Sequence, residues 1–481
     1  MEIIGEGGYG CVISPAIDCD GKQLPNKVSK VGVKSDIEEE YRKYRLIELA
    51  DKHAEYYIGK PNYVCLPDSK EFITTLNKCD MFRDKKLFDY NIDLYAQLIM
   101  NYGGVTLGKY IKSINKLTPN SYRKYLEIQK MNEYYDRPEV KKHMERQYQN
   151  PTMLKNLKLH LQESEGAKNT IIEKLESAKT EEEREQGIKA LEDVYTTITK
   201  IQKLLEPPNL KQPLPQFSEK DQETINNIQN KVERMFVNIY TLFLGIDVFV
   251  KTRIIHRDIK PLNIIYDEEA NRMYFIDFGL MTSFSEIINN KSKNLNMYNN
   301  PREQKFYVDF ENETSTKKLK DTLDYMQDEA RHIFDDLFEN KYVFDEETVL
   351  EQYETMINKL QPDDKMKKLL MTKSLPTFDL YGLGYTLFTI INQLEFSCGQ
   401  LNLDILELCK QMMNWNVFDR ISVKQAMVKY EQILKRNGLL DKYDICIKRY
   451  KVQSKHRSLR TLSASKTKRR SKTRRINSAR V

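Results

Sequence analysis

The sequence contains no run of about 18 apolar residues, the length from which a transmembrane helix is built. Its most apolar stretches, 241–250 and 378–391, are shorter, and each carries an aspartate. They therefore predict buried core helices. The N-terminal segment lacks the positive charge followed by apolar residues that marks a secretory signal. We expect a protein that is neither inserted in a membrane nor secreted.

Paired cysteines are also missing. The seven cysteines are scattered and odd in number, and none forms a CxxC pair. This pattern is typical neither of a zinc site nor of a disulfide framework. It favours a reducing compartment, so an intracellular location in the cytoplasm or the nucleus is expected.

Acidic residues are absent from 451–481, which hold twelve Lys and Arg. Subtracting these twelve from the net charge of +7 leaves about −5 for the rest of the chain, so a mildly acidic body carries a strongly basic tail. With almost nothing apolar, the tail is predicted to be disordered. It could contact nucleic acid or acidic proteins nonspecifically, serve as a localisation signal, or only aid solubility.

The body of the chain predicts an α+β protein. Residues 1–104 combine short strand patterns with one amphipathic helix at 36–52, where apolar residues recur every three or four positions. Helical patterns dominate 225–450. Two polar stretches, 113–224 and 306–374, predict helical insertions. For the first we expect an exposed hairpin with charged faces, and the alternative is an arm that binds partners or forms oligomers.

The central motif is HRDIKPLN at 256–263, followed by Asp277-Phe278-Gly279 directly after a strand pattern. Phosphoryl transfer needs a carboxylate near the attacking hydroxyl, a cation near the moving phosphate and oxygen ligands for magnesium. The two motifs supply this set at the spacing HRDxKxxN then DFG, and here the chain resembles the protein kinase family.

The resemblance implies a role for each residue of these motifs. Asp258 would accept or orient the proton of the substrate hydroxyl, and Lys260 would neutralise the γ-phosphate. Asn263 and Asp277 would hold Mg²⁺, with Mn²⁺ as the alternative metal. Taken singly, such Asp and Asn residues more often cap turns. His256 would be structural and would pack toward the DFG motif.

A glycine motif at the start of the chain, G-x-G-x-x-G-x-V, supplies Gly5, Gly7, Gly10 and Val12. Glycines let backbone N–H groups approach phosphates closely, and the resemblance places Val12 over the adenine ring of ATP. A Rossmann turn has similar spacing but is disfavoured, because no apolar helix follows at once.

The kinase pattern also requires a lysine on the third strand and a glutamate on the next helix. Val28-Ser29-Lys30 is the best match for the lysine, although Lys27 and Lys34 are nearby. For its partner we choose Glu40, which shares the apolar face of the predicted helix, with Glu39 second and Glu38 also possible by position. Acidic residues are also common at solvated helix N-termini, where the helix macrodipole stabilises their negative charge.

Residues 98–104 resemble the hinge between the kinase lobes. Met100 would be the gatekeeper, the backbone of Asn101 and Gly103 would pair with adenine, and Ile265 would floor the adenine pocket. The family usually has Glu where Asn101 stands, but those contacts involve the main chain.

Further matches concern the large lobe and its regulation. Asn300-Pro301-Arg302-Glu303 is closest to the family's A-P-E, so Glu303 is predicted to pair with Arg420, and Asp379 to brace the backbone of the catalytic loop. Arg257 would pair with a phosphate in the following loop. The candidate acceptors there are Thr282, Ser283, Ser285 and Ser292.

Together these patterns predict a bilobal protein kinase-like fold over 1–450, with a small β-rich lobe at 1–104 and a large helical lobe. The expected activity is transfer of the γ-phosphate of Mg·ATP to protein Ser/Thr hydroxyls. The alternatives are a pseudokinase or scaffold, a small-molecule kinase, and a nucleic-acid-associated virion protein. The insertions resemble those of divergent Ser/Thr kinases of large DNA viruses, which implies a viral protein, with association with the virion as one expected location.

Overall fold

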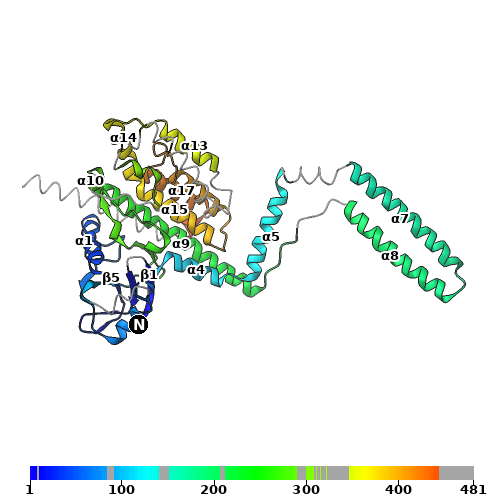
Figure 1. The fold of residues 1–481 in the computed structure, drawn as a ribbon, viewed down its shortest axis with the longest axis horizontal. Helices are drawn as coiled ribbons and strands as arrows, with labels where there is room; N and C mark the ends of the chain where they lie inside the picture. The colour runs from blue at the N-terminus through cyan, green and yellow to red at the C-terminus, as the bar shows by residue number, and fades with distance from the viewer. Residues whose placement is uncertain are drawn as a thin grey trace, which may run out of the picture. The chain divides into compact units, whose positions relative to one another are not determined.

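The computed structural model describes residues 1–7, 10–83, 92–138, 140, 151–205, 212–289, 299–307, 310, 315, 321 and 346–443. The predicted tail, Ser292 and about half of the second insertion lie outside them. The fold is mixed α+β and divides into two compact units (Figure 1). One unit contains residues 1–117 and the chain from 227 onward, and the other contains 118–226.

The N-terminal part is a five-stranded antiparallel sheet in the order β1-β2-β5-β7-β6. Its strands are β1 (Glu2–Gly7), β2 (Gly10–Ser14), β5 (Lys27–Val33), β7 (Tyr95–Asn101) and β6 (Asn62–Val64). A separate pair, β3 (Ala16–Ile17) and β4 (Gln23–Leu24), follows β2. The short strand patterns expected in 1–104 are therefore present.

The two faces of this sheet carry different side chains. Cys11 lies opposite Val31 in the register, and both are fully buried among apolar residues of α2 (Lys70–Leu76) and α3 (Asp80–Arg83). Val12 lies opposite Lys30, one position along. Because neighbouring residues of a strand point to opposite faces, Val12 and Lys30 share the other face.

Helix α1 (Lys34–Ala50) packs on β5 and β7 and corresponds to the helix predicted at 36–52. Its buried residues are Ile37, Glu40, Tyr44 and Ile47. Their spacing of three and four places them along one side of the helix. The burial of Glu40 within this apolar row marks it as a residue with a specific partner.

Between the sheet and the helical part, the chain forms small strand pairings that frame the central motifs. β8 (Val105–Thr106), β10 (Ile264–Asp267) and β11 (Arg272–Phe275) form an antiparallel sheet in the order β11-β10-β8. β9 (Ile254–Ile255) pairs with β12 (Thr282–Ser283). The HRDIKPLN motif therefore begins directly after β9, and the DFG motif lies between β11 and β12.

The helical part surrounds α9 (Glu219–Thr252) and α15 (Phe378–Gln393), both rich in buried apolar side chains. The other helices are α4 (Leu107–Leu117), α10 (Phe284–Ile288), α13 (Glu346–Ile357), α14 (Asp364–Ser374), α16 (Gln400–Met412), α17 (Val423–Arg436) and α18 (Leu439–Lys442). Short 3-10 helices are η2 (Ile92–Leu94), η3 (Pro261–Asn263), η4 (Phe278–Leu280), η5 (Arg302–Tyr307) and η6 (Leu375–Thr377).

Among the described residues, α9 alone is long and apolar enough to cross a membrane by length and composition. Of its most apolar window, 67% is buried inside the protein, as expected for a core helix.

The second unit contains the first insertion. α5 (Asn120–Asp136) begins it, and α7 (Pro151–Ser177) and α8 (Glu181–Leu205) pack along each other as a hairpin (Figure 1). The hairpin carries long charged faces, as the sequence predicts, and Leu159 and Tyr195 are among its exposed apolar side chains. The unit spans 118–226, against the predicted 113–224.

The cysteines are arranged differently from the expectation. Cys11 pairs with Cys79, and Cys19 pairs with Cys65, with Cα–Cα separations of 6.5 and 5.6 Å. The prediction that the cysteines form no disulfides was therefore wrong for these four. Each pair joins residues 46 or more positions apart, so it depends on the packing of the sheet and not on local spacing. The cysteines therefore do not indicate a reducing compartment, and the location remains a prediction.

Candidate active site

The first cluster of the site connects the sheet, helix α1 and the DFG motif. Nζ of Lys30 lies 2.6 Å from Oε2 of Glu40 and 2.9 Å from Oδ1 of Asp277. The predicted Lys30–Glu40 contact is therefore present. Glu39, the second choice, is exposed and faces Lys43 along the helix. Lys30 thus joins two carboxylates from elements that are far apart in the sequence.

Burial and charge act against each other in this cluster. Burial disfavours the ammonium of Lys30, but Glu40 and Asp277 outweigh it and raise its pKa. Burial, assisted by Asp277, raises the pKa of Glu40 against the influence of Lys30. Burial would also raise the pKa of Asp277, but Lys30, His256 and Lys260 together lower it. Lys30 therefore favours the charged form of both carboxylates, and its influence prevails over burial at Asp277.

The second cluster is the loop around Asp258, a buried residue that is 5% exposed. Nζ of Lys260 and Nδ2 of Asn263 donate to Oδ2 of Asp258 at 2.8 and 2.7 Å. Asn263 Nδ2 also donates to the backbone carbonyl of Asp258 at 2.9 Å. Asn299, which the sequence did not single out, donates from Nδ2 to Oδ1 at 3.0 Å.

The two clusters are adjacent. The backbone N–H of Ile276 donates to the carbonyl of Asn263 at 3.0 Å, which fixes the residue before Asp277 against the loop. The backbone of Asp277 has a φ of 64°, in the left-handed region that residues other than glycine rarely adopt. Such strain persists only where the surroundings impose it and is concentrated at functional sites.

Aromatic packing holds the DFG motif against α1. The ring of Phe278 lies 5.1 Å from that of Tyr44 and 5.1 Å from that of His256, measured between centroids. His256 also contacts the carbonyl of Ile276 through Nε2 at 3.1 Å. His256 is thus fully buried and packs toward the second motif, as expected of a structural residue.

The glycine motif occupies β1 and β2. Gly5 lies opposite Val12, which lies opposite Lys30. At Gly7, a Cβ would meet nothing within 4 Å, so its surroundings are open. At Gly10, a Cβ would lie 2.3 Å from the carbonyl oxygen of Val31, so this glycine is required for the close packing of β2 on β5.

The predicted hinge, residues 98–104, begins within β7 and continues beyond its end at Asn101. Met100 is 8% exposed, and its Sδ accepts a hydrogen bond from the Tyr44 hydroxyl at 3.6 Å. The side chain of Asn101 accepts from Lys27 Nζ at 2.9 Å and donates to the carbonyl of Ile58 at 3.0 Å.

Gly103 lies beside Ile265, whose Cγ2 would be 3.5 Å from a Cβ at this position. A Cβ would also come within 2.5 Å of Ile58 Cγ2. The structure therefore places Gly103 and Ile265 together, and the lack of a side chain at 103 allows Ile58 to pack closely against the backbone.

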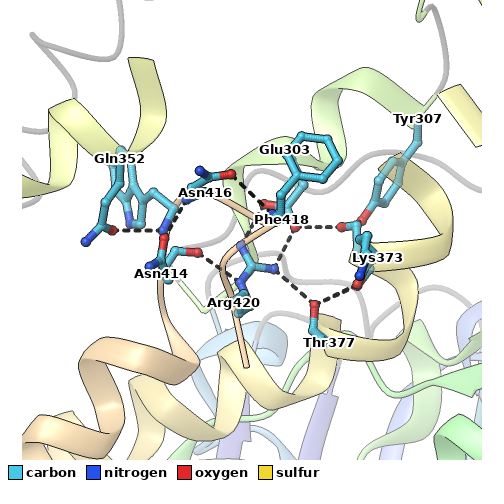
Figure 2. A network of polar contacts seen from close by, with 11 residues as sticks. Glu303, Tyr307, Gln352, Lys373, Thr377, Asn414, Asn416, Phe418 and Arg420 are labelled. Atoms are coloured by element: carbon cyan, nitrogen blue, oxygen red, sulfur yellow. Dashed lines mark hydrogen bonds and ion pairs between the residues drawn. The ribbon is translucent and has the colours of Figure 1, made fainter. Parts of the chain in front are cut away.

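Two further contacts predicted from the sequence are present, one at the 256–263 loop and one within the helical part. The carboxylate of Asp379 accepts the backbone N–H groups of His256 and Arg257 at 2.8 and 3.0 Å. Glu303 and Arg420 form a bidentate ion pair at 2.6 and 2.9 Å (Figure 2). Both contacts are confirmed.

The chemistry of the donors fits the groups that the sequence implies. Asp277 and Asn263 offer a carboxylate and an amide oxygen, the hard ligands that Mg²⁺ prefers, and Mg²⁺ usually keeps waters and phosphate oxygens as its other ligands. The described residues contain no cluster of three or more His, Cys, Asp or Glu. This is compatible with a site in which the protein contributes only two of the metal ligands. No protein-family model matches the sequence.

Proposed function

We propose that the protein is a Mg·ATP-dependent serine/threonine protein kinase. The observation that carries the proposal is the convergence of two clusters from separate motifs. Lys30, Glu40 and Asp277 form one, and the Asp258 loop with Lys260 and Asn263 forms the other. Phosphoryl transfer is catalysed mainly by positioning and charge, and these residues provide both.

The fold supports the same proposal. The five-stranded sheet with α1 would be the small lobe of a bilobal protein kinase-like fold, and the helices around α9 and α15 would be the large lobe. Residues 98–104 would connect them. The Lys30–Glu40 contact and the packing of Phe278 under α1 favour a catalytically competent arrangement over that of a pseudokinase.

Each residue then has a definite task. Lys30, held by Glu40, binds the α- and β-phosphates, and Asn263 and Asp277 hold the metal. Lys260 stabilises negative charge on the phosphate being transferred. Asp258 orients the substrate hydroxyl and takes its proton. Bound Mg·ATP would supply the phosphoryl group and the charge neutralisation that the side chains alone lack.

The adenine end would be formed by the described residues around the hinge. Val12 and Ile265 would enclose the ring from opposite sides, and the backbone at Asn101 and Gly103 would pair with its edge. Gly5, Gly7 and Gly10 would lie over the phosphates, with Gly10 acting by packing β2 onto β5. Met100 would limit the depth of the pocket.

The test is transfer of radiolabelled γ-phosphate from Mg·ATP to basic protein substrates by the full chain, followed by phosphoamino acid analysis. Label on Ser and Thr is expected. Asp258→Ala should lower the rate by about 10²–10⁴-fold with ATP binding retained, and Asp277→Ala should also weaken binding of Mg·ATP. Asp68→Ala, an exposed aspartate, is the control.

Two outcomes would contradict the proposal. Transfer that persists in both active-site variants would show that the residues have other roles. No transfer by a folded wild-type chain that binds ATP would favour a pseudokinase or scaffold. If transfer then appeared only with small molecules, the substrate class would be wrong.

A further inference from the structure

Asn299 contacts the proposed catalytic base although it belongs to neither central motif. It is 5% exposed. Its Nδ2 donates to Oδ1 of Asp258 at 3.0 Å and to the carbonyl of Ile259 at 3.1 Å, so both amide hydrogens are used. The side-chain amide is thus fixed in orientation by two acceptors from the catalytic loop.

The arrangement of donors around Asp258 leaves a defined acceptor position. A carboxylate has about four positions at which it accepts hydrogen bonds. Lys260 and Asn263 occupy Oδ2, while Asn299 occupies one side of Oδ1. The remaining position therefore belongs to Oδ1, on the side away from the Asn299 amide.

We propose that Asn299 is a positioning residue that turns this remaining position of Asp258 toward the substrate hydroxyl. The hydroxyl proton passes to Oδ1 as the hydroxyl oxygen bonds to the γ-phosphorus and the bond from phosphorus to ADP breaks. Asn299 touches none of the reacting atoms and acts only through Asp258. This inference rests on the proposed kinase function and adds a residue to it.

Asn299 is itself held in place from two sides. Its backbone carbonyl packs on α15 at Gly382, where a Cβ would lie only 3.2 Å from that oxygen and 3.2 Å from Cβ of Ile259. Four residues later, Glu303 is anchored by Arg420. The segment that begins at 299 is therefore attached rigidly to the helical part, and Asn299 transmits that rigidity to Asp258.

The experiment is a double-mutant cycle in the full chain, with kcat and the KM for ATP measured for each variant. Asn299→Leu removes the donor at nearly equal volume and should lower kcat by about 10²-fold, the order expected when a reacting group is misplaced. The KM for ATP should stay unchanged, because Asn299 contacts neither Lys30 nor Asp277. Asn299→Asp, which keeps the shape but offers an oxygen in place of the donor, should lower kcat at least as much.

The same substitution in the Asp258→Ala background distinguishes positioning from a structural role. If Asn299 acts through Asp258, Asn299→Leu should leave the residual rate of that background unchanged. A structural role would lower both rates alike. Asn402→Leu replaces a buried asparagine that makes no hydrogen bond to Asp258, and should leave kcat close to the wild-type value.

The outcomes separate this inference from the proposed function. Active wild type with Asn299→Leu and Asn299→Asp at wild-type kcat, or with equal losses in both backgrounds, would overturn the role of Asn299 alone. A folded, ATP-binding wild type without transfer would overturn the proposed function and this inference with it. ATP binding measured by calorimetry shows whether each variant is folded. If Asn299→Leu does not fold, Asn299→Asp provides the test of the role of Asn299.

Discussion

Removing one partner of the Glu303–Arg420 ion pair should destabilise the larger unit strongly. Both side chains are fully buried, and Arg420 also donates to the carbonyl of Asn414 and the hydroxyl of Thr377 (Figure 2). Ser374 donates a further hydrogen bond to Glu303 at 2.6 Å. Burial alone would disfavour the guanidinium, but Glu303 more than compensates and raises the pKa of Arg420.

The expected magnitude follows from what each substitution leaves behind. Arg420→Met leaves the Glu303 carboxylate buried without its cation, and such a change costs about 3–5 kcal/mol of unfolding free energy. Glu303→Leu leaves the opposite charge and should cost a similar amount. The double variant leaves no charge, only unsatisfied polar neighbours, so its cost should fall to about 1–3 kcal/mol.

The assay is urea unfolding of the full chain, followed by circular dichroism at several wavelengths because two units unfold. Arg436→Met is the matched control. Arg436 pairs with Asp404 at 2.9 Å but is 64% exposed, so its loss should cost at most about 1 kcal/mol. The reasoning would be refuted if Arg420→Met cost no more than the control, or if the two single losses simply added in the double variant.

Two further predictions concern the segment after the DFG motif and the motif itself. Partial burial of Glu286 opposes its ionisation, but donation from the Thr282 hydroxyl and the Ser283 N–H lowers its pKa. Its charge therefore stabilises the fold above the unfolded carboxyl pKa of about 4.3 and loses this effect as the pH falls through the folded value. The urea midpoints of wild type and Glu286→Gln should converge on acidification, and a constant difference from pH 7 to 3 would contradict this. Phe278→Ala should lower the free energy of unfolding by about 3–5 kcal/mol, because it leaves a cavity between α1 and the loop. Tyr102→Ala, which removes an exposed ring, should lower it by less than about 0.5 kcal/mol in the same urea titration. Equal effects of the two substitutions would show that the aromatic packing contributes little.

Several contacts were predictable because they depend on local pattern. The spacing of apolar residues locates α1 and places Glu40 on its buried face, which favours it over Glu39 without any knowledge of tertiary contacts. Glu303 and Arg420 were paired through short motifs that occur 117 positions apart. In each case the residue type and its neighbours carry the signal.

Other features depend on the assembled fold. Asn299 lies 41 positions after Asp258, and its own neighbourhood resembles an ordinary polar turn. The same is true of Cys11 and Cys79, which meet only because β2 packs against the segment that follows α2. The side chain of Asn101 was expected to matter little, yet it holds Lys27 and the backbone of Ile58. Such contacts are set by packing between distant segments, which single-sequence patterns do not report.

The alternation along β2 and β5 has a consequence for how this chain can vary. Lys30 reaches Glu40 and Asp277 from one face, while its neighbour Val31 is buried on the other. A one-residue deletion within β5 would exchange the two faces, because side chains alternate strictly along a strand. The ammonium would then be turned into an apolar layer with Cys11 and Phe72. Length changes should therefore be confined to the connections between these strands, such as the turn at Gly21 that joins β3 to β4.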